Sequence, residues 1–176
     1  MREHQEPAPK QPADTRLDAR YSHPAAVADG WADAVDRLAA AEIFWLSTVR
    51  PDGRPHVTPL LTVWWRDTLW FSSGERERKV LNLRANPEVV LTTGTNALVG
   101  GQDLVVEGTA VRESDDARLR ELAALWELKY GPEWRFEVRD GAFVGAGGTV
   151  PVFGVVPRTA FGFTKDPYSQ TRWRFD

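Results

Sequence analysis

Short β-prone runs separated by tight-turn signals fill the middle of the chain, and they limit the folds that it can adopt. Three such runs occupy residues 43–49, 55–65 and 68–73. Asp52-Gly53 lies between the first two, and this pair favours a hairpin turn because glycine accepts positive φ. Pro59 has no N–H for a strand ladder, so the second run is predicted to be an edge or bulged strand.

Helical patterns flank and interrupt these strand signals. Residues 74–86 are predicted to form a short helix that ends before Pro87, because a residue preceding proline disfavours the α conformation. The other predicted elements are a helix over 29–42 capped by Asp29 or Asp33, and strands over 88–93 and 103–112 with a bend or bulge at Gly108. Residues 114–116 are predicted to cap a long helix that ends near Tyr130, and a last β segment over 149–156 and 159–164 is predicted to be broken near Pro157.

The pattern gives about six strands, mostly linked as hairpins, with one short helix inserted among them. Evenly spaced short strands are typical of closed or nearly closed barrels rather than of βαβ folds. We therefore predict a mainly β (α+β) fold, a six-stranded barrel with flanking helices. Residues 1–24 are polar and lack hydrophobic periodicity, so they are predicted to be a flexible tail that precedes a single domain over residues 25–176.

The amino-acid composition excludes several classes of function or argues against them. The 176 residues include no cysteine, which excludes disulfides and thiolate chemistry, and the three histidines show no metal-ligand spacing. A net charge of −3 argues against general nucleic-acid binding. No apolar run reaches the roughly 20 residues of a membrane helix, and the first residues lack a signal-peptide core. We expect a cytoplasmic protein without metal, membrane or nucleic-acid partners.

The segment where the third strand run passes into the short helix carries the clearest chemical signal. Ser72 and Ser73 precede the helix, and Arg76, Arg78 and Lys79 lie at or near its start. Hydroxyls, free N–H groups at a helix start and basic side chains together favour an anion such as a phosphate. A solvated, charged helix start is the alternative interpretation, and local pattern alone leaves both open.

The order of motifs along the chain resembles a known family. The motifs are residues 52–55 (DGRP), 79–87 (KVLNLRANP), 106–110 (VEGTA) and 171–175 (TRWRF). Together they resemble the pyridoxamine 5′-phosphate oxidase-like FMN- and F420-binding split barrels, and most closely the actinobacterial flavin- and deazaflavin-dependent oxidoreductases. The resemblance spans about residues 42–175. It implies a split β-barrel that acts as a homodimer with two cofactor sites at its interface.

The resemblance also implies particular cofactor contacts. Lys79 would bind the phosphate with Arg78 or Arg76 beside it, while Trp173 and Arg174 would reach the site from the second subunit. Relatives often carry a basic residue where this chain has Glu77. The full implied set is His56, Val57, Thr58 and Pro59 along the ring, Ser72 and Ser73 as donors, Arg76, Arg78, Lys79 and Val80 around the phosphate, and Trp173 and Arg174.

These features favour an oxidoreductase that uses F420, with FMN as the second choice, to reduce or oxidise a small organic substrate. No catalytic side chain is predicted, because such a cofactor carries the hydride chemistry itself. Two other functions stay open: a non-catalytic flavin or haem carrier on the same fold, and a small aromatic barrel that binds single-stranded nucleic acid by base stacking.

Overall fold

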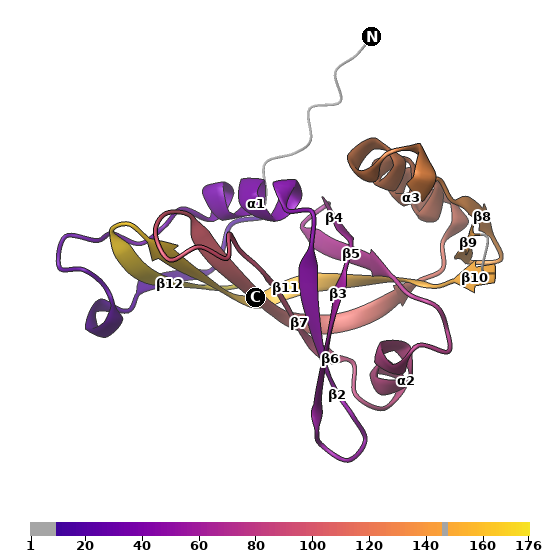
Figure 1. Cartoon of the computed structure of the whole chain (residues 1–176), viewed down its shortest axis with the longest axis horizontal. Helices are drawn as coiled ribbons and strands as arrows, with labels where there is room; N and C mark the ends of the chain where they lie inside the picture. The colour runs from indigo at the N-terminus through magenta and orange to yellow at the C-terminus, as the bar shows by residue number, and fades with distance from the viewer. Residues whose placement is uncertain (1–9, 146–147) are drawn as a thin grey trace, which may run out of the picture.

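A computed structural model describes residues 10–145 and 148–176, and this part of the chain is mainly β (Figure 1). The strands are β1 (Asp14–Leu17), β2 (Phe44–Val49), β3 (Pro55–Leu60), β4 (Thr62–Trp65), β5 (Thr68–Ser72), β6 (Glu88–Thr93), β7 (Gln102–Glu113), β8 (Glu137–Arg139), β9 (Ala142–Gly145), β10 (Gly148–Val150), β11 (Val152–Lys165) and β12 (Tyr168–Arg174). The helices are α1 (Trp31–Ala40), α2 (Arg78–Ala85) and α3 (Asp116–Tyr130), with short 3-10 turns η1 (Ala19–Tyr21) and η2 (Pro132–Trp134).

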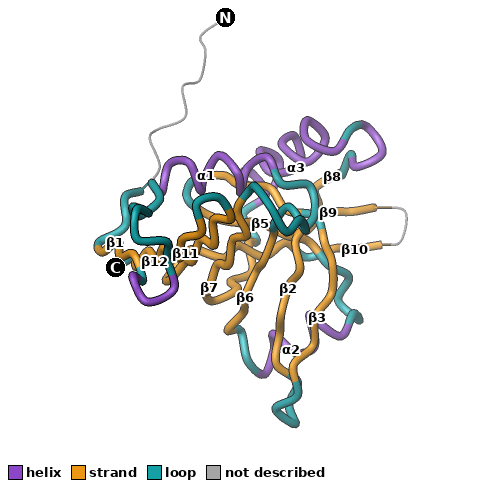
Figure 2. The backbone as a smooth tube through the Cα atoms, turned by 60° about the vertical axis from the view of Figure 1, so that its left-hand side comes forward, coloured by secondary structure: helices purple, strands orange, loops and turns teal. Residues whose placement is uncertain are grey.

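One antiparallel sheet of nine strands organises the molecule. Its main path runs β1-β12-β11-β7-β6-β2-β3, while β5 adds to β11 and β4 pairs with β5. The first part of β11 pairs with β7 on one side and with β5 on the other, so the strands wrap around a shared core. A second sheet, β10-β9-β8, lies beside α3 (Figure 2).

Several predicted elements are confirmed. The strand predicted over 88–93 matches β6, and those over 43–49 and 68–73 match β2 and β5 to within one residue. Leu69 and Phe71 face one hydrophobic cluster while Trp70 faces another, as the alternation predicted. Pro59 lies in β3, which stands at the end of the sheet path together with Pro55, as the missing N–H required.

Other elements differ from the prediction. The run 55–65 divides at Leu61, so β3 pairs with β2 while β4 pairs with β5. The predicted last β segment divides between two strands: residues 149–150 belong to β10 of the second sheet, and β11 runs unbroken from Val152 to Lys165. The register of β11 shifts near Arg158, opposite Gly108, so the bulge belongs to β11 rather than β7. Helix α1 begins at Trp31 with Gly30 as its N-cap. Neither Asp29 nor Asp33 supplies a capping hydrogen bond.

The predicted flexible tail and the six-strand count also need correction. Residues 14–17 of that tail form β1, which pairs with β12 along Asp14–Leu17, and η1 follows at Ala19–Tyr21. Residues 1–9 lie outside the described part of the chain. The described residues hold twelve strands rather than about six. The prediction missed β1, β12 and β8–β10 because these strands are short or paired to distant segments and give weak local signals.

Tryptophans form much of the interior. Trp31 on α1 contacts the rings of Trp64, Trp173 and Phe175, with ring centroids 6.1, 5.3 and 4.8 Å away. The Trp173 indole donates to the Asp29 carbonyl at 3.1 Å. These contacts pack α1 against β4 and β12 of the sheet. Core packing therefore explains much of the tryptophan content.

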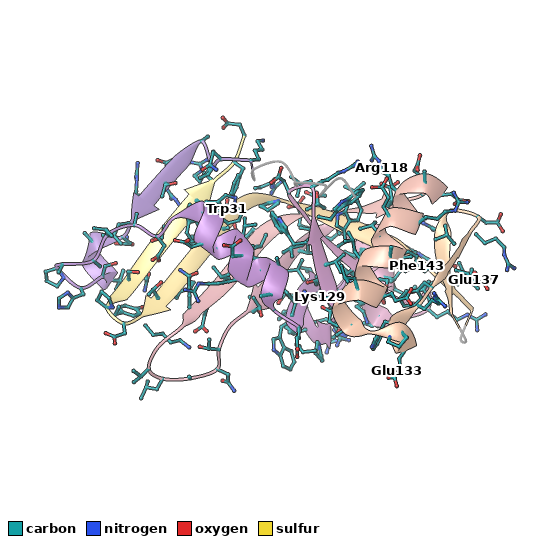
Figure 3. All side chains as sticks on the ribbon, turned by 90° about the horizontal axis from the view of Figure 1, so that it is seen from above. Trp31, Arg118, Lys129, Glu133, Glu137 and Phe143 are labelled. Carbon is teal, nitrogen blue, oxygen red and sulfur yellow. The ribbon has the colours of Figure 1, made fainter. Side chains whose placement is uncertain are left out.

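The last two residues of α3 form hydrogen bonds to the end of α1 and the start of β4. Lys129, on the side of α3 that faces α1 (Figure 3), donates from Nζ to the carbonyls of Ala41 at 2.7 Å and Thr62 at 2.9 Å. The Tyr130 hydroxyl also donates to the Thr62 carbonyl at 2.7 Å. Burial lowers the pKa of Lys129 to about 8 and raises that of Tyr130 to about 12.

Candidate functional site

The start of α2 lacks the usual side-chain cap. Glu77 occupies the N-cap position, but its carboxylate accepts from the Gly74 N–H at 2.9 Å and pairs with the Lys79 ammonium instead. Burial opposes the charge on Glu77, yet donation from Lys79 and Gly74 outweighs it and lowers the pKa of this carboxyl. The first-turn N–H groups of α2 are therefore open to another acceptor.

Lys79 is held in place by the buried face of α2. Its side chain is 10% exposed, whereas that of Glu77 is 51% exposed, so the carboxylate lies nearer to solvent than the ammonium. One turn later, Asn82 is fully buried and donates from Nδ2 to the Thr48 hydroxyl at 2.9 Å. This bond joins α2 to β2 and fixes the direction from which Lys79 approaches the neighbouring strands.

His56 on β3 belongs to the same group of side chains. It stands opposite Thr48 in the β2–β3 ladder, and its Nδ1 lies 3.4 Å from the Thr48 hydroxyl. Burial lowers the pKa of His56, and the positive charges of Arg50, Lys79 and Arg78 lower it further. Three cations thus act on one half-buried imidazole, which marks a region of positive potential.

Ser73 adds a hydroxyl that lacks a partner. The residue is 3% exposed, and its Oγ has no hydrogen-bond partner among the described residues. It lies close enough to the Glu77 carboxyl to help lower the pKa of that group. We call the group Arg50, His56, Ser73, Arg78 and Lys79 the anion cradle. An orphaned buried hydroxyl beside cations and a free helix start fits a phosphate group.

The other predicted residues near α2 take separate positions. Ser72 is half-buried beside Ser73, and Arg76 is exposed on the turn before α2. The Val80 side chain packs in the main hydrophobic core, so a cofactor contact by this residue is left to its backbone N–H in the first turn of α2. Val57 and Pro59 are exposed on the outer side of edge strand β3, and Thr58 is half-buried between them.

The prediction that Trp173 reaches a second subunit is wrong. Trp173 is fully buried within its own chain against Trp31, since alternation along β12 turns Thr171 and Trp173 inward. The residues of β12 that face outward are Tyr168, Gln170, Arg172 and Arg174. Arg174 is exposed, so its predicted role stays open.

Arg172, on β12, lines a cleft, which we call the Arg172 cleft. Strand β12 lies far along the sheet path from β2 and β3, the strands beside the anion cradle, and Figure 1 shows β12 and α2 on opposite sides of the molecule. The Arg172 cleft has a volume of about 410 Å³ and is lined by Arg16, Leu17, Asp18, Arg20, Phe161, Phe163, Gln170, Thr171 and Arg172. Arg16 and Arg172 are directly opposed across β1 and β12, and like charges in that position repel each other. Arg172 has a long contact of 3.4 Å with Asp14, and its Nε is buried without a partner.

A larger groove of about 610 Å³ lies over β7 and β11, away from the anion cradle. Its arginines are already paired: Arg112 with Glu75, Arg118 with Glu113 and Arg158 with Glu88. Size alone therefore does not make it the better anion site. Within the described ranges, no group of three or more His, Cys, Asp or Glu residues could hold a metal ion. No helix in those ranges is long and apolar enough to cross a membrane.

Sequence reasoning missed Arg50, and it contained Arg172 only as part of the motif over residues 171–175. Arg50 directly precedes the Pro51–Arg54 turn, and the hairpin brings it back toward His56, since its N–H donates to the Arg54 carbonyl at 2.9 Å. The predicted Asp-Gly hairpin was the signal that could have located it. Arg172 needed the β12 strand, whose alternation separates it from Trp173.

Comparison with known proteins agrees with this architecture. A family model described as Pyridoxamine 5′-phosphate oxidase matches residues 31–144. No curated protein sequence matches the chain. Among solved structures, the conserved hypothetical protein Rv2991 from Mycobacterium tuberculosis has a TM-score of 0.62 at 18% identity, with 89% of this chain and 90% of that chain covered.

Two further solved structures have printed ligand or activity names. An FAD-binding protein from Mesorhizobium loti has a TM-score of 0.58 at 16% identity, over 90% of this chain and 96% of that chain. An F420 reductase has a TM-score of 0.50 at 23% identity, over 70% and 91%. At these identities the likeness establishes the fold alone. Together with the family match, it confirms the predicted mainly β split barrel with flanking helices.

Proposed function

The chain belongs to the pyridoxamine 5′-phosphate oxidase family, and we propose that it is an oxidoreductase that holds a flavin-type cofactor by its phosphate in the anion cradle. The observation that carries this proposal is the buried, unpartnered Ser73 hydroxyl beside Lys79 and the open start of α2. Arg50 and Arg78 supply further positive charge, as their effect on the pKa of His56 indicates.

Edge strand β3 is the proposed support for the cofactor ring. It begins beside the cradle at His56 and continues through Val57, Thr58 and Pro59, and no described strand pairs with its outer edge. A flat ring held by its phosphate at Lys79 would lie along this edge. The cofactor supplies the hydride chemistry, while the chain binds it, orients it and excludes water from it.

F420 is our preferred cofactor, and FMN is the second choice. Support for a flavin-type group comes from the family, from the FAD-binding relative in fold and from the F420 reductase of similar fold. The preference for F420 rests on the resemblance of the motifs to the actinobacterial branch. The substrate is proposed only as a small organic molecule.

A homodimer would complete the site. Within one chain the Arg172 cleft is separated from β3 by five strand spacings of about 4.8 Å each, so one small cofactor cannot contact both. On the outer face of the sheet, Trp45 on β2 and Val57 on β3 are exposed apolar side chains. We propose that this face meets a second copy, and that Arg172 and Phe161, rather than Trp173, reach the partner's cofactor.

Titration of the purified protein with F420, FMN and riboflavin tests the proposal. We expect F420 or FMN fluorescence to be quenched at much lower protein concentration than riboflavin fluorescence, because riboflavin lacks the phosphate. Equal affinity for riboflavin and FMN would refute phosphate anchoring, and tight FMN binding without F420 binding would overturn the cofactor preference. Light scattering on a sizing column gives the oligomeric state, and hydride turnover with a panel of acceptors separates an enzyme from a carrier.

A further inference from the structure

Glu77 is a negative charge placed within a site of otherwise positive character. Its carboxylate contacts the Lys79 ammonium and accepts from the Gly74 N–H at 2.9 Å, so the turn itself holds it in position. It is also the more exposed partner of the pair. A ligand that approaches Lys79 from solvent therefore meets the Glu77 carboxylate beside the ammonium.

The charged groups of the anion cradle come from three elements. Arg78 and Lys79 lie on α2, Arg50 follows β2, and His56 lies on β3. The neighbouring acid on the turn, Glu75, points elsewhere and pairs with Arg112 at 3.6 Å. Glu77 is therefore the acid that pairs with Lys79 of the cradle, while Asp52 on the β2–β3 turn pairs with Arg54 and also interacts with the charge of Arg50. Its lowered pKa keeps it ionised at neutral pH.

The charge on a phosphate depends on how it is esterified. A phosphomonoester such as that of FMN loses its second proton with a pKa of about 6 and is close to doubly charged at neutral pH. A phosphodiester has a single negative charge shared by two oxygens, and its two ester oxygens are uncharged. A carboxylate at the mouth of the cradle repels the extra charge of the monoester, but it can lie against an ester oxygen with little cost.

From this geometry we infer that Glu77 is a specificity-determining residue, which makes the anion cradle select a phosphodiester-linked flavin-type cofactor over a phosphomonoester. The inference rests on the proposed function, because it assumes that the cradle holds a cofactor phosphate. It also gives a physical reason for the difference from relatives that carry a basic residue at this position. F420, whose phosphate is a diester, is compatible with such a site.

A matched pair of ligands tests the inference by binding alone. FMN and its phosphate methyl ester share one ring and one ribityl chain and differ in phosphate charge, so quenching titrations of the full chain compare the charge directly. At about pH 8 we expect the wild-type protein to prefer the methyl ester, and Glu77→Gln to raise the affinity for FMN relative to the methyl ester by about tenfold. The amide oxygen that this substitution introduces can still accept from the Gly74 N–H, so the turn is preserved.

Acidification provides a second, independent measurement. Near pH 5.5 FMN becomes singly charged, with a second pKa of about 6, so the wild-type preference for the methyl ester should largely disappear. Burial and the neighbouring cations lower the pKa of His56, and any positive charge that this imidazole gains on acidification would also favour FMN. The same acidification is therefore carried out on His56→Gln, which lacks that charge. The preference should disappear there too, so the measurement decides the question even if Glu77→Gln folds poorly.

Glu75→Gln is the control, because it removes a carboxylate from the same turn that points away from the cradle. We expect it to leave the ratio of the two affinities unchanged. An unchanged ratio in Glu77→Gln, or an equal change in Glu75→Gln, would overturn the inference while phosphate anchoring stands. Failure of FMN, its methyl ester and F420 to bind any better than riboflavin would instead overturn the proposed function.

Discussion

Asn82 donates a hydrogen bond from Nδ2 to the hydroxyl of Thr48 at 2.9 Å, and both side chains are buried. This bond connects the short helix α2 to strand β2, one turn after Lys79. The position of the ammonium in the cradle thus depends on a contact that a phosphate-binding pattern alone would not reveal.

Thr48→Val should weaken both folding and cofactor binding. It leaves the Asn82 amide buried without its acceptor, which costs about 1–3 kcal/mol in the free energy of unfolding. Because α2 is then less firmly held, we also expect a lower affinity for the cofactor. Urea unfolding and fluorescence titration measure the two effects. Thr15→Val, on an exposed position of β1, is the control. An unfolding midpoint equal to that of the wild type would contradict the role of this bond.

Lys79→Ala should weaken binding of the phosphate-bearing cofactor by about 1–3 kcal/mol, the order expected for loss of a charge-assisted contact. Riboflavin affinity should stay nearly constant, because that ligand has no phosphate. Titration by fluorescence quenching gives both values. Arg139→Ala removes an exposed cation on β8 and serves as the control for net charge. If Lys79→Ala binds FMN and F420 as the wild type does, the phosphate lies elsewhere.

Arg172→Gln and Trp173→Phe should affect different properties. Arg172 faces outward into the Arg172 cleft, so its loss should weaken cofactor binding in the proposed dimer with little change in stability. Trp173→Phe removes ring volume from the core and the bond to the Asp29 carbonyl, and should cost about 1–3 kcal/mol of stability. Titration and urea unfolding of both variants separate the roles. The reverse pattern would restore the original assignment of Trp173 to the cofactor.

Lys129 predicts a dependence of stability on alkaline pH. Its folded pKa of about 8 lies below its ordinary value of 10.5, so between these values the unfolded chain binds more protons than the folded one. The free energy of unfolding therefore gains a contribution that increases with pH from about 8 upward. Tyr130 acts in the opposite direction above its ordinary pKa of 10.0, because its folded pKa is about 12. Between about pH 8 and 10, Lys129 changes the free energy of unfolding while Tyr130 does not yet oppose it.

Urea unfolding across this window, with Lys129→Met for comparison, checks the prediction. The variant lacks the titrating amine, so the difference between wild type and variant should change with pH in favour of the wild type. Parallel stability curves would show that Lys129 does not titrate in this range. The lost hydrogen bonds to Ala41 and Thr62 only add a constant offset.

The hairpins were predictable because their signals are local. The Asp-Gly turn, the alternation of Leu69, Trp70 and Phe71, and the stop at Pro87 each act within a few residues. The pairing of β1 with β12 was not predictable in this way, because it joins segments more than 150 residues apart. The flexible tail was misassigned for this reason. The role of Trp173 was misassigned because its burial depends on the β12 strand and on the distant Trp31 of α1.

Residues of the candidate site were likewise predictable where they are close in the sequence and missed where they are not. Ser73, Arg78 and Lys79 lie close together in the sequence and were found from it, whereas Arg50 reaches the cradle only through the β2–β3 hairpin. Glu77 stood out in the sequence as a departure from relatives. Its pairing with Lys79 required the geometry of the turn.

The two prolines of β3 limit the addition of further strands at this edge of the sheet. A bare sheet edge invites strands of other molecules to add to it, and uncontrolled growth of that kind leads to aggregates. Pro55 and Pro59 interrupt the row of N–H donors that an incoming strand would need. The chain can therefore keep this edge uncovered for a flat ligand without offering a template for fibril formation.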